Sequence, residues 1–385
     1  MRPDAMRRLP LEAGAVESWL AAGCGPAQAP VRGVVAILPA AETARLPVLQ
    51  QACRQAGVAL LGALFPRLID GDALVDEGAW LLALPQVPAG FLIERLEDDA
   101  LQAGDQVAEA ARTALAGVEG PAADPRLLLV FDGQLPRIGS IVEQAYLQLD
   151  GRLQLLGVNA GDGSFTAVPC LFDSQRFIGS GVIGLLLPAP VHSALGMQPA
   201  AVTELYTVTA SQDNRVDCIN GRPAFEVYRE LMAREHGIAL TSSNFYEHAV
   251  HYPLALLRGD DQVLYRIPVA LEPDGAITCI GEIPQFSLLS VLHAPAPEQM
   301  QCMDLLAQGL QPQQADGQLL VFYCAGRCQQ FAGGHARELA LLQQRLAPKV
   351  QAGALTLGEI GNTNGWGYPL FYNGALVGLG WNLDR

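Results

Sequence analysis

The feature that most constrains this 385-residue chain is a pattern of strand, helix, strand and closing strand that recurs three times. In the third copy an apolar strand at 319–322 precedes a helical pattern from about Gly334, a second strand that ends at Gly361, and a closing strand at 373–381. The earlier copies have the same order, at residues 31–38, 47–56, 58–65 and 76–84, and again at 127–131, 138–149, 153–163 and 179–187. Continuous apolar strands that alternate with helices are typical of repeated α/β units.

The pattern predicts an α/β fold in which repeated strand-helix-strand units form mixed, largely parallel sheets flanked by helices, in two similar domains. After residue 190 the texture changes to short β segments separated by turns such as that at 259–261. We therefore expect an N-terminal extension at 1–29, one domain at 30–205 and a second at 206–385. A helix is expected to begin at Asp105 as its N-cap and to end at Gly117.

Composition restricts the classes of partner. Half of the residues are hydrophobic and 16% are charged, which is typical of a globular chain. The net charge of −15 argues against nucleic acid and anionic membrane as partners. The arginine-rich start is not followed by an uninterrupted apolar segment, so we expect a cytoplasmic location. The eight cysteines lack paired CxxC spacing, and we expect them to be buried free thiols.

Polar residues follow the strands of the second and third copies. Cys324 and Arg327 follow one strand of the third copy, and Glu359 follows the next. Because two strands of one sheet can end at the same edge, Arg327 and Glu359 are expected to form an ion pair there. In the second copy Asn159 and Asp162 stand where Glu359 stands in the third; a tight turn explains these residues equally well.

Position 132 also belongs to this set. Asp132 is expected to match Tyr323 in the repeat and to face the same groove.

With these residues in view, the chain resembles the FIST family, a two-part sensory module of bacterial signalling proteins. The resemblance rests on an ordered set of segments: DQVAEAARTALAG before LLLVFDG, LLGVNAGDGSF, VTASQDNRVDCINGRPAFEVYRELM, YPLALLRGDDQVLYRIPVALEPDGAITCIGEIP, and VFYCAGR followed by LTLGEIG. It covers most of the chain from about residue 30 and implies an N-terminal and a C-terminal FIST domain. One departure is GALFPRLIDGD, where many FIST proteins have a Gly-Cys-Thr-like turn.

The resemblance implies a ligand-binding sensor, and it extends to a stand-alone branch that binds haem and senses nitric oxide. Such proteins act on a partner histidine kinase or cyclic-di-GMP enzyme, and a homodimer is compatible with this layout. For haem, the candidate axial ligands are His248 and His251, which lie among aromatic residues in NFYEHAVHYPL. His251 is the first choice for the iron. The alternative is that both are ordinary hydrogen-bonded histidines of the fold.

Three other hypotheses remain open. The first is a FIST module that holds a small amino-acid-like metabolite at Asn159, Asp162, Arg327 and Glu359, with Cys324 nearby. The second is an enzyme with Cys324 as its nucleophile, and the third is a scaffold without a ligand. The GxGxxG match at 179–184 is not a dinucleotide site, because the required helix does not follow it.

Overall fold

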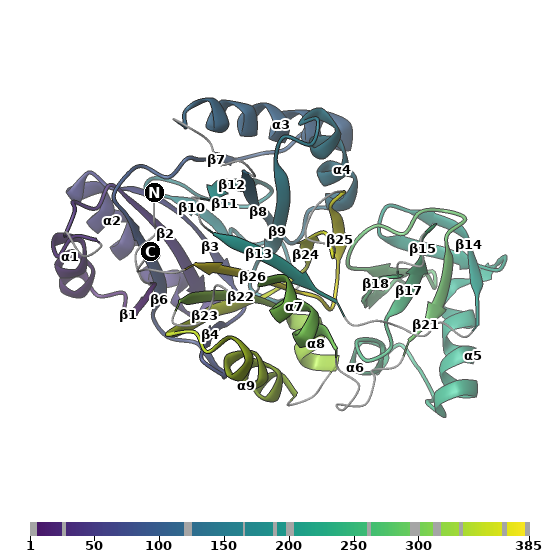
Figure 1. Cartoon of the computed structure of the whole chain (residues 1–385). Helices are drawn as coiled ribbons and strands as arrows, with labels where there is room; N and C mark the ends of the chain where they lie inside the picture. The colour runs from purple at the N-terminus through teal and green to yellow at the C-terminus, as the bar shows by residue number, and fades with distance from the viewer. Residues whose placement is uncertain are drawn as a thin grey trace.

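The three predicted copies fold alike. The computed structural model describes residues 6–24, 28–118, 125–164, 166–187, 191–197, 204–259, 263–292, 301–310, 317–330, 334–363 and 368–381. Each copy forms the main part of a six-stranded sheet, and the three sheets lie together in one body (Figure 1). At the centre of each sheet two parallel strands are bordered by antiparallel ones. The predicted α/β fold of repeated units with mixed sheets is confirmed.

Each unit runs in the same order: edge strand, helix, first parallel strand, helix, second parallel strand, closing strand. The first unit consists of β1 (Arg7–Leu9), α1 (Ala13–Ala21), β2 (Gly33–Pro39), the 3-10 helix η1 (Ala40–Arg45), α2 (Leu46–Ala56), β3 (Ala59–Phe65) and β6 (Ala79–Leu84). The second consists of β7 (Gly90–Ile93), α3 (Ala100–Ala116), β8 (Arg126–Asp132), α4 (Ile138–Gln148), β9 (Gln154–Ala160) and β12 (Val182–Leu187). The third consists of β13 (His192–Gly196), α7 (Cys302–Leu310), β22 (Gln318–Cys324), α8 (Ala325–Gln330), α9 (Gly334–Leu346), β23 (Val350–Thr356) and β26 (Leu376–Trp381).

A hairpin after the second parallel strand of each unit joins the sheet of another unit. The three hairpins are β4 (Leu68–Asp70) with β5 (Ala73–Val75), β10 (Leu171–Asp173) with β11 (Phe177–Ile178), and β24 (Glu359–Gly361) with β25 (Leu370–Tyr372). The hairpin of the first unit pairs with β23, that of the third with β9, and that of the second with β3. The exchange closes a cycle, so the body has pseudo-threefold symmetry.

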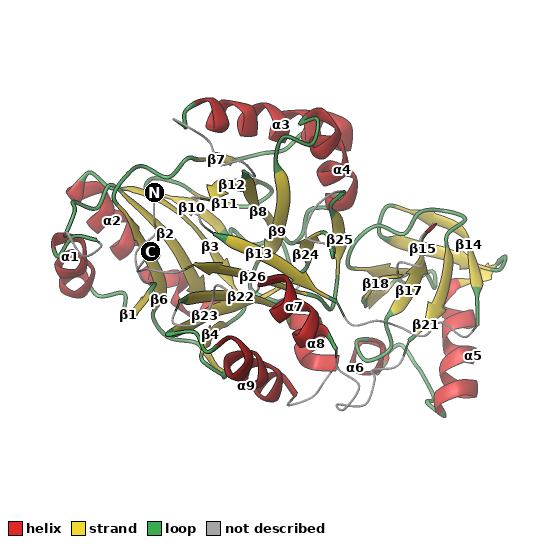
Figure 2. Ribbon diagram, viewed as in Figure 1, coloured by secondary structure: helices red, strands yellow, loops and turns green. Residues whose placement is uncertain are grey.

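A separate β domain is inserted into the third unit, between β13 and α7 (right side of Figure 1). Its strands pair antiparallel in one eight-stranded sheet and α5 lies beside them (Figure 2). Its elements are β14 (Tyr206–Gln212), β15 (Arg215–Ile219), β16 (Arg222–Pro223), α5 (Ala224–His236), α6 (Phe245–Ala249), β17 (Leu254–Leu257), β18 (Val263–Arg266), β19 (Pro268–Leu271), β20 (Ile277–Cys279) and β21 (Leu288–Val291). We refer to it as the inserted domain.

Two details of the sequence prediction have clear outcomes. Helix α3 begins six residues earlier than expected, because the N-cap is Asp99, whose side chain accepts hydrogen bonds from the backbone N–H groups of Leu101 and Gln102. The predicted N-cap Asp105 is wrong: it lies inside α3 and accepts a hydrogen bond from Gln144. The cysteines are free, as expected, and Cys218 and Cys328 alone among them are not fully buried.

The core strands are apolar on both faces because both faces are covered. Strands β8, β9 and β22 are buried along almost their whole lengths. Helices cover one face of each sheet, and the other face packs towards the two remaining sheets (Figure 2). None of the helices in the described residues is long and apolar enough to cross a membrane.

Candidate functional site

A polar cavity lies between the second unit and the inserted domain. Its volume is about 160 Å³. The second unit contributes residues at the carboxyl ends of the parallel strands β8 and β9, and the inserted domain closes the opposite side. The lining residues are 133–138, Asn159, Asn214, Val269, Ala270, 278–281 and Phe371. Ligands of open α/β sheets bind beyond the carboxyl ends of the strands, which is where this cavity lies.

The side-chain amide of Asn159 is a buried part of the cavity wall that lacks hydrogen-bond partners. Its side chain is fully buried, and neither Oδ1 nor Nδ2 has a hydrogen-bond partner within the described structure. Its backbone is held on both sides, since its N–H donates to Gly358 O at 2.9 Å and its C=O accepts from Leu357 N at 3.0 Å. A buried amide without partners costs roughly 1–3 kcal/mol. The fold therefore holds an unsatisfied donor and acceptor at a fixed position beside an opening.

The amino end of α4 forms another part of the wall. Arg137 precedes the helix in a left-handed conformation (φ 59°), and its Nε lies 3.6 Å from Asp213 Oδ1 of the inserted domain. Glu282, also of the inserted domain, accepts a hydrogen bond from Ser140 N at 2.9 Å and another from Ser140 Oγ. These contacts hold the inserted domain against α4. The partial positive charge at this helix end is met by the Glu282 carboxylate, and the Arg137 guanidinium by that of Asp213.

The remaining wall is apolar and rigid. Phe371, from the hairpin of the third unit, lies under the guanidinium of Arg266 at 5.5 Å. Arg266 is fully buried and donates to the carbonyl oxygens of Tyr265, Phe371 and Glu282. Burial lowers its pKa to about 10. Gly281 has φ 84°, and a Cβ there would lie 2.6 Å from the Phe371 ring, so the close approach of these two walls requires glycine.

Arg327 does not take the partner expected from the sequence. Its Nε and Nη2 bind the carboxylate of Glu338 from α9, Nη1 donates to Gly374 O at 3.2 Å, and Nη2 also lies 2.7 Å from Cys302 Sγ. Tyr323 donates to the same Glu338 carboxylate. The predicted Arg327–Glu359 ion pair is therefore wrong in its partner: the guanidinium is directed into the third unit, between α8, α9 and α7.

Glu359 and Cys324 form a second buried cluster beside this network. Thr356 Oγ1 donates to Glu359 Oε1 at 2.6 Å, and Ala375 N donates to Oε2 at 3.3 Å. Burial raises the pKa of Glu359 to about 8, although these hydrogen bonds lower it. Burial likewise raises the pKa of the Cys324 thiol, and the Glu359 carboxyl raises it further. Both side chains are fully or almost fully buried, and neither lines the polar cavity.

Of the three candidates from the second unit, only Asn159 lines the polar cavity. Asn159 faces the cavity, whereas Asp162 lies past the strand end and accepts hydrogen bonds from Ser164 N and Oγ. Asp132 is buried and caps two turns, at Gln134 N and Ser180 N. The parallel registers pair Asp132 with Ala160 and Cys324 with Thr356, so Asp132 corresponds to Cys324. The predicted match of Asp132 with Tyr323 is one residue out of register.

His248 and His251 lie together on the inserted domain, at α6 and in the turn that follows it. His251 N donates to His248 O at 3.0 Å, and both side chains are half-buried. The polar cavity and an apolar one between the sheets have no histidine among their lining residues, nor do two others in the described part of the chain. The polar cavity is also smaller than the 300–1,000 Å³ typical of cofactor pockets. The described cavities therefore do not fit haem ligated by either histidine, and this assignment stays a prediction.

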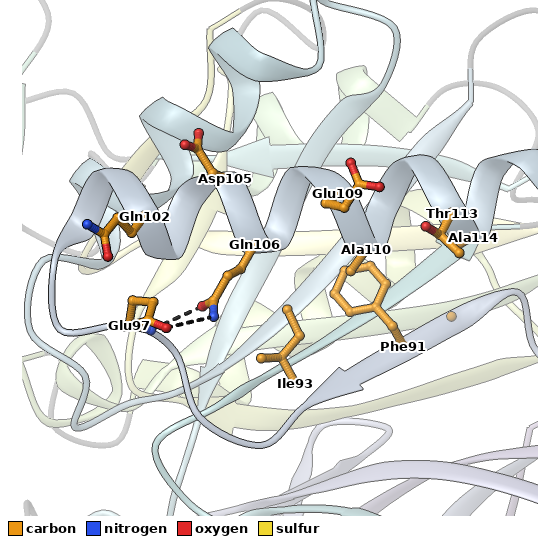
Figure 3. A pocket seen from close by; sticks show the side chains of 11 residues that line it. Phe91, Ile93, Glu97, Gln102, Asp105, Gln106, Glu109, Ala110, Thr113 and Ala114 are labelled. Carbon is orange, nitrogen blue, oxygen red and sulfur yellow. Dashed lines mark hydrogen bonds between the residues drawn. The ribbon is translucent and has the colours of Figure 1, made fainter.

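A larger hollow of about 850 Å³ follows α3, but it is an open groove (Figure 3). Phe91 and Ile93 of β7 point from its floor towards the helix. Glu97 and Gln106 on its rim satisfy each other, since Glu97 N donates to Gln106 Oε1 at 3.1 Å and Gln106 Nε2 lies 3.4 Å from Glu97 Oε1. It lacks the enclosed, unsatisfied polar group that distinguishes the cavity at Asn159.

Sequence reasoning identified Asn159 but missed Arg137, Asn214 and Phe371. A signal for the site was present in the repeat. The registers of the three parallel pairs align Asn159 with Leu64 and Leu355, so one copy has an amide where the other two have leucine. The residues contributed by the inserted domain had no comparable signal, because that domain has no counterpart in the other copies.

The fold and the cavity define a class of α/β proteins built from repeated units with an inserted β domain that closes a ligand-sized cavity. Sequence comparison then identifies the family. The model of the FIST N domain matches residues 34–222, and the model of the FIST C domain matches residues 224–362. The chain belongs to the FIST family, whose domains are sensor domains of signal transduction. No curated protein matches the chain.

Proposed function

We propose that this chain is a sensor whose ligand is a small amino-acid-like metabolite bound in the cavity around Asn159. The observation that carries the proposal is the fully buried Asn159 amide, which lines the cavity with both polar atoms unsatisfied. Natural folds satisfy nearly all buried polar groups, so an exception beside a cavity favours a ligand as the missing partner.

The cavity chemistry matches the two ends of an amino acid. Asn159 Oδ1 accepts from an ammonium group, and Nδ2 donates to a carboxylate. In this proposal the ligand carboxylate joins Asp213 at the Arg137 guanidinium, which lines the cavity. The aromatic ring of Phe371 and the aliphatic side chains around it accommodate a short apolar side chain. A volume of about 160 Å³ limits the ligand to a small molecule.

In this proposal, ligand binding changes the position of the inserted domain relative to the second unit, and this change is the signal. The cavity wall is shared by the second unit and the inserted domain, and the Arg137–Asp213 and Ser140–Glu282 contacts join the two beside it. A ligand that binds both walls favours the closed arrangement and shifts the population towards it. In this proposal a histidine kinase or cyclic-di-GMP enzyme responds to the position of the inserted domain.

The test is a thermal unfolding screen of the full chain against the twenty common amino acids, one at a time, with wild type and Asn159→Leu. Leucine is the residue of the other two units at this position. At least one amino acid should raise Tm of the wild type and leave Tm of the variant unchanged. Without ligand the variant should be more stable than the wild type, by roughly 1–3 kcal/mol, because the unsatisfied amide is gone.

Asn373→Leu is the matched control. Asn373 is also fully buried but does not line the cavity, so this variant should keep the ligand response whatever happens to its stability. The proposal fails if no amino acid shifts the wild type, or if Asn159→Leu responds as the wild type does.

Haem-dependent nitric oxide sensing at His248 or His251 is a separate prediction. It requires a Soret band in protein supplied with haem, a shift of that band on addition of nitric oxide, and loss of haem affinity in His248→Ala/His251→Ala. A colourless mixture, or unchanged haem affinity of the double variant, excludes these two histidines as ligands.

A further inference from the structure

An apolar cavity lies on the pseudo-threefold axis, where the three sheets meet. Its volume is about 120 Å³. Each unit contributes the third residue of its first parallel strand, namely Val35, Leu128 and Leu320. Each also contributes the fourth and sixth residues of its closing strand: Leu82 and Leu84, Leu185 and Leu187, Leu379 and Trp381. We call this the axial cavity.

Trp381 is the residue that breaks the symmetry of the axial cavity. Leucine occupies the equivalent position in the other two units, at Leu84 and Leu187. Trp381 is 3% exposed, and its indole Nε1 has no hydrogen-bond partner in the described structure. Trp80, which is buried to a similar degree, donates its Nε1–H to Ile69 O at 2.9 Å. Buried indole N–H groups usually find such a partner.

Neither better packing nor water accounts for this arrangement. A protein interior is normally close-packed, and a void of this size loses contacts on all sides. A buried water needs two to four polar partners, and among the lining residues only Gln86 and Trp381 have polar side-chain atoms. An apolar cavity of about 150 Å³ in another protein stays dry and binds benzene, so a cavity of about 120 Å³ accepts a molecule of similar size.

The axial cavity also reaches the surface. The segment 86–89 lines one end, and Val87 in that segment is 63% exposed. A ligand can therefore enter without unfolding of the three sheets. This end is distinct from the polar cavity at Asn159, whose lining shares no residue with it.

We propose that the axial cavity is a second binding site, for a small apolar molecule with one carbonyl oxygen that accepts a hydrogen bond from Trp381 Nε1. Ketones and esters of about the size of benzene have this chemistry. The apolar walls bind the hydrocarbon part, and the single donor fixes its orientation.

The test uses the full chain labelled with ¹⁵N-tryptophan and two probes of the same shape, cyclohexanone and methylenecyclohexane. The indole signal of Trp381 is assigned by its loss in Trp381→Phe. Cyclohexanone should shift this signal and leave that of Trp80 unchanged. Trp381→Phe should bind cyclohexanone about fivefold more weakly than wild type, which is the worth of one neutral hydrogen bond. Methylenecyclohexane should show no such difference.

Leu128→Phe fills the axial cavity and should abolish binding of both probes. The titration of wild type with the two probes tests the site even if a variant does not fold. The assignment of a site is overturned if neither probe moves the Trp381 signal. The assignment of a carbonyl ligand is overturned if Trp381→Phe weakens both probes equally.

Discussion

At position 159 the second unit has an asparagine where the first and third units have Leu64 and Leu355. At the end of the closing strand the third unit has Trp381 where the others have leucine. In both places the exception introduces a hydrogen-bonding group that the fold leaves unsatisfied beside a cavity. In a repeated fold, each position can be compared with the equivalent positions of the other units. A polar residue at a position that is apolar in the other units therefore indicates a candidate binding site.

Glu359 is a buried, hydrogen-bonded carboxyl group, and its effect should be visible in the pH dependence of stability. Burial raises its pKa to about 8 in the folded chain, whereas the ordinary value is 4.5. Between these values the folded state binds more protons than the unfolded state. The free energy of unfolding contributed by Glu359 therefore falls as pH rises from about 4.5 to 8, and it is constant above that. Urea unfolding at pH 5 and pH 8 should show that wild type loses stability relative to Glu359→Gln, on the order of a few kcal/mol.

Glu230→Gln provides the comparison for this measurement. Glu230 is exposed and hydrogen-bonded to Arg222, which lowers its pKa, so it is ionised in both states throughout the range. Its difference from wild type should be flat between pH 5 and pH 8. A flat difference for Glu359→Gln as well would mean that Glu359 is ionised in the folded chain.

Sequence reasoning selected Asn159, Cys324 and Glu359 because they stand near the ends of apolar strands, and only Asn159 lines the polar cavity. Their role in ligand binding stays a prediction, whereas the choice of a partner for Arg327 failed. The choice of Glu359 for Arg327 was wrong because Glu338 lies on a helix whose packing the sequence does not specify. The shift of Asp132 by one residue shows why register matters, since it assigns the side chain to the other face of the sheet.

At the scale of elements, the Arg327–Glu338 pair joins α8 and α9 in the third unit. Both side chains are 1–2% exposed. Burial by itself would lower the pKa of Arg327, but Cys302 and Glu338 outweigh this and raise it. Glu338→Ala leaves a buried guanidinium without its carboxylate and should lower the free energy of unfolding by about 3–5 kcal/mol. Urea unfolding monitored by circular dichroism measures the change.

Two variants make this result interpretable. Glu230→Ala removes an exposed partner of Arg222 and should change stability little. Arg327→Met/Glu338→Leu replaces the pair with apolar groups and should recover most of the loss. If Glu338→Ala were as mild as Glu230→Ala, the buried pair would not hold α8 and α9 in place.

The elements themselves were well predicted, but their pairing across units was not. Apolar periodicity located the strands and helices of all three copies, because it reflects local burial. The exchanged hairpins are pairings between segments far apart in the chain, such as Ile69 with Gly353. No local pattern encodes such a pairing. The sequence indicated the inserted domain by a change to short β segments near residue 200. Only the structure shows that this domain lies within the third unit.

For the whole molecule, the FIST N and FIST C matches meet at residues 222–224, inside the inserted domain. The three sheets follow a different division, in which two units and the first strand of the third precede the inserted domain. The family boundary therefore does not separate two independent bodies. The cavity at Asn159 has walls from both matches, so each match contains only part of the candidate site.

The hairpin exchange makes a prediction about how the whole body opens. Ile69 belongs to the first unit in sequence, but it is fully buried among side chains of the third unit and pairs with β23. Ile69→Ala should destabilise the chain by about 2–5 kcal/mol, and the loss of hydrogen-exchange protection should appear first in β22 and β23. Leu49→Ala, a fully buried residue of α2, should instead affect β2 and β3 first. Hydrogen-exchange mass spectrometry distinguishes these patterns. If exchange in Ile69→Ala became faster only within residues 33–84 of the first unit, the exchanged hairpin would not link the stability of the first unit to that of the third. If Ile69→Ala does affect the third unit first, then no unit can open without exposing a sheet edge of its neighbour. A ligand that stabilises one unit would then stabilise all three.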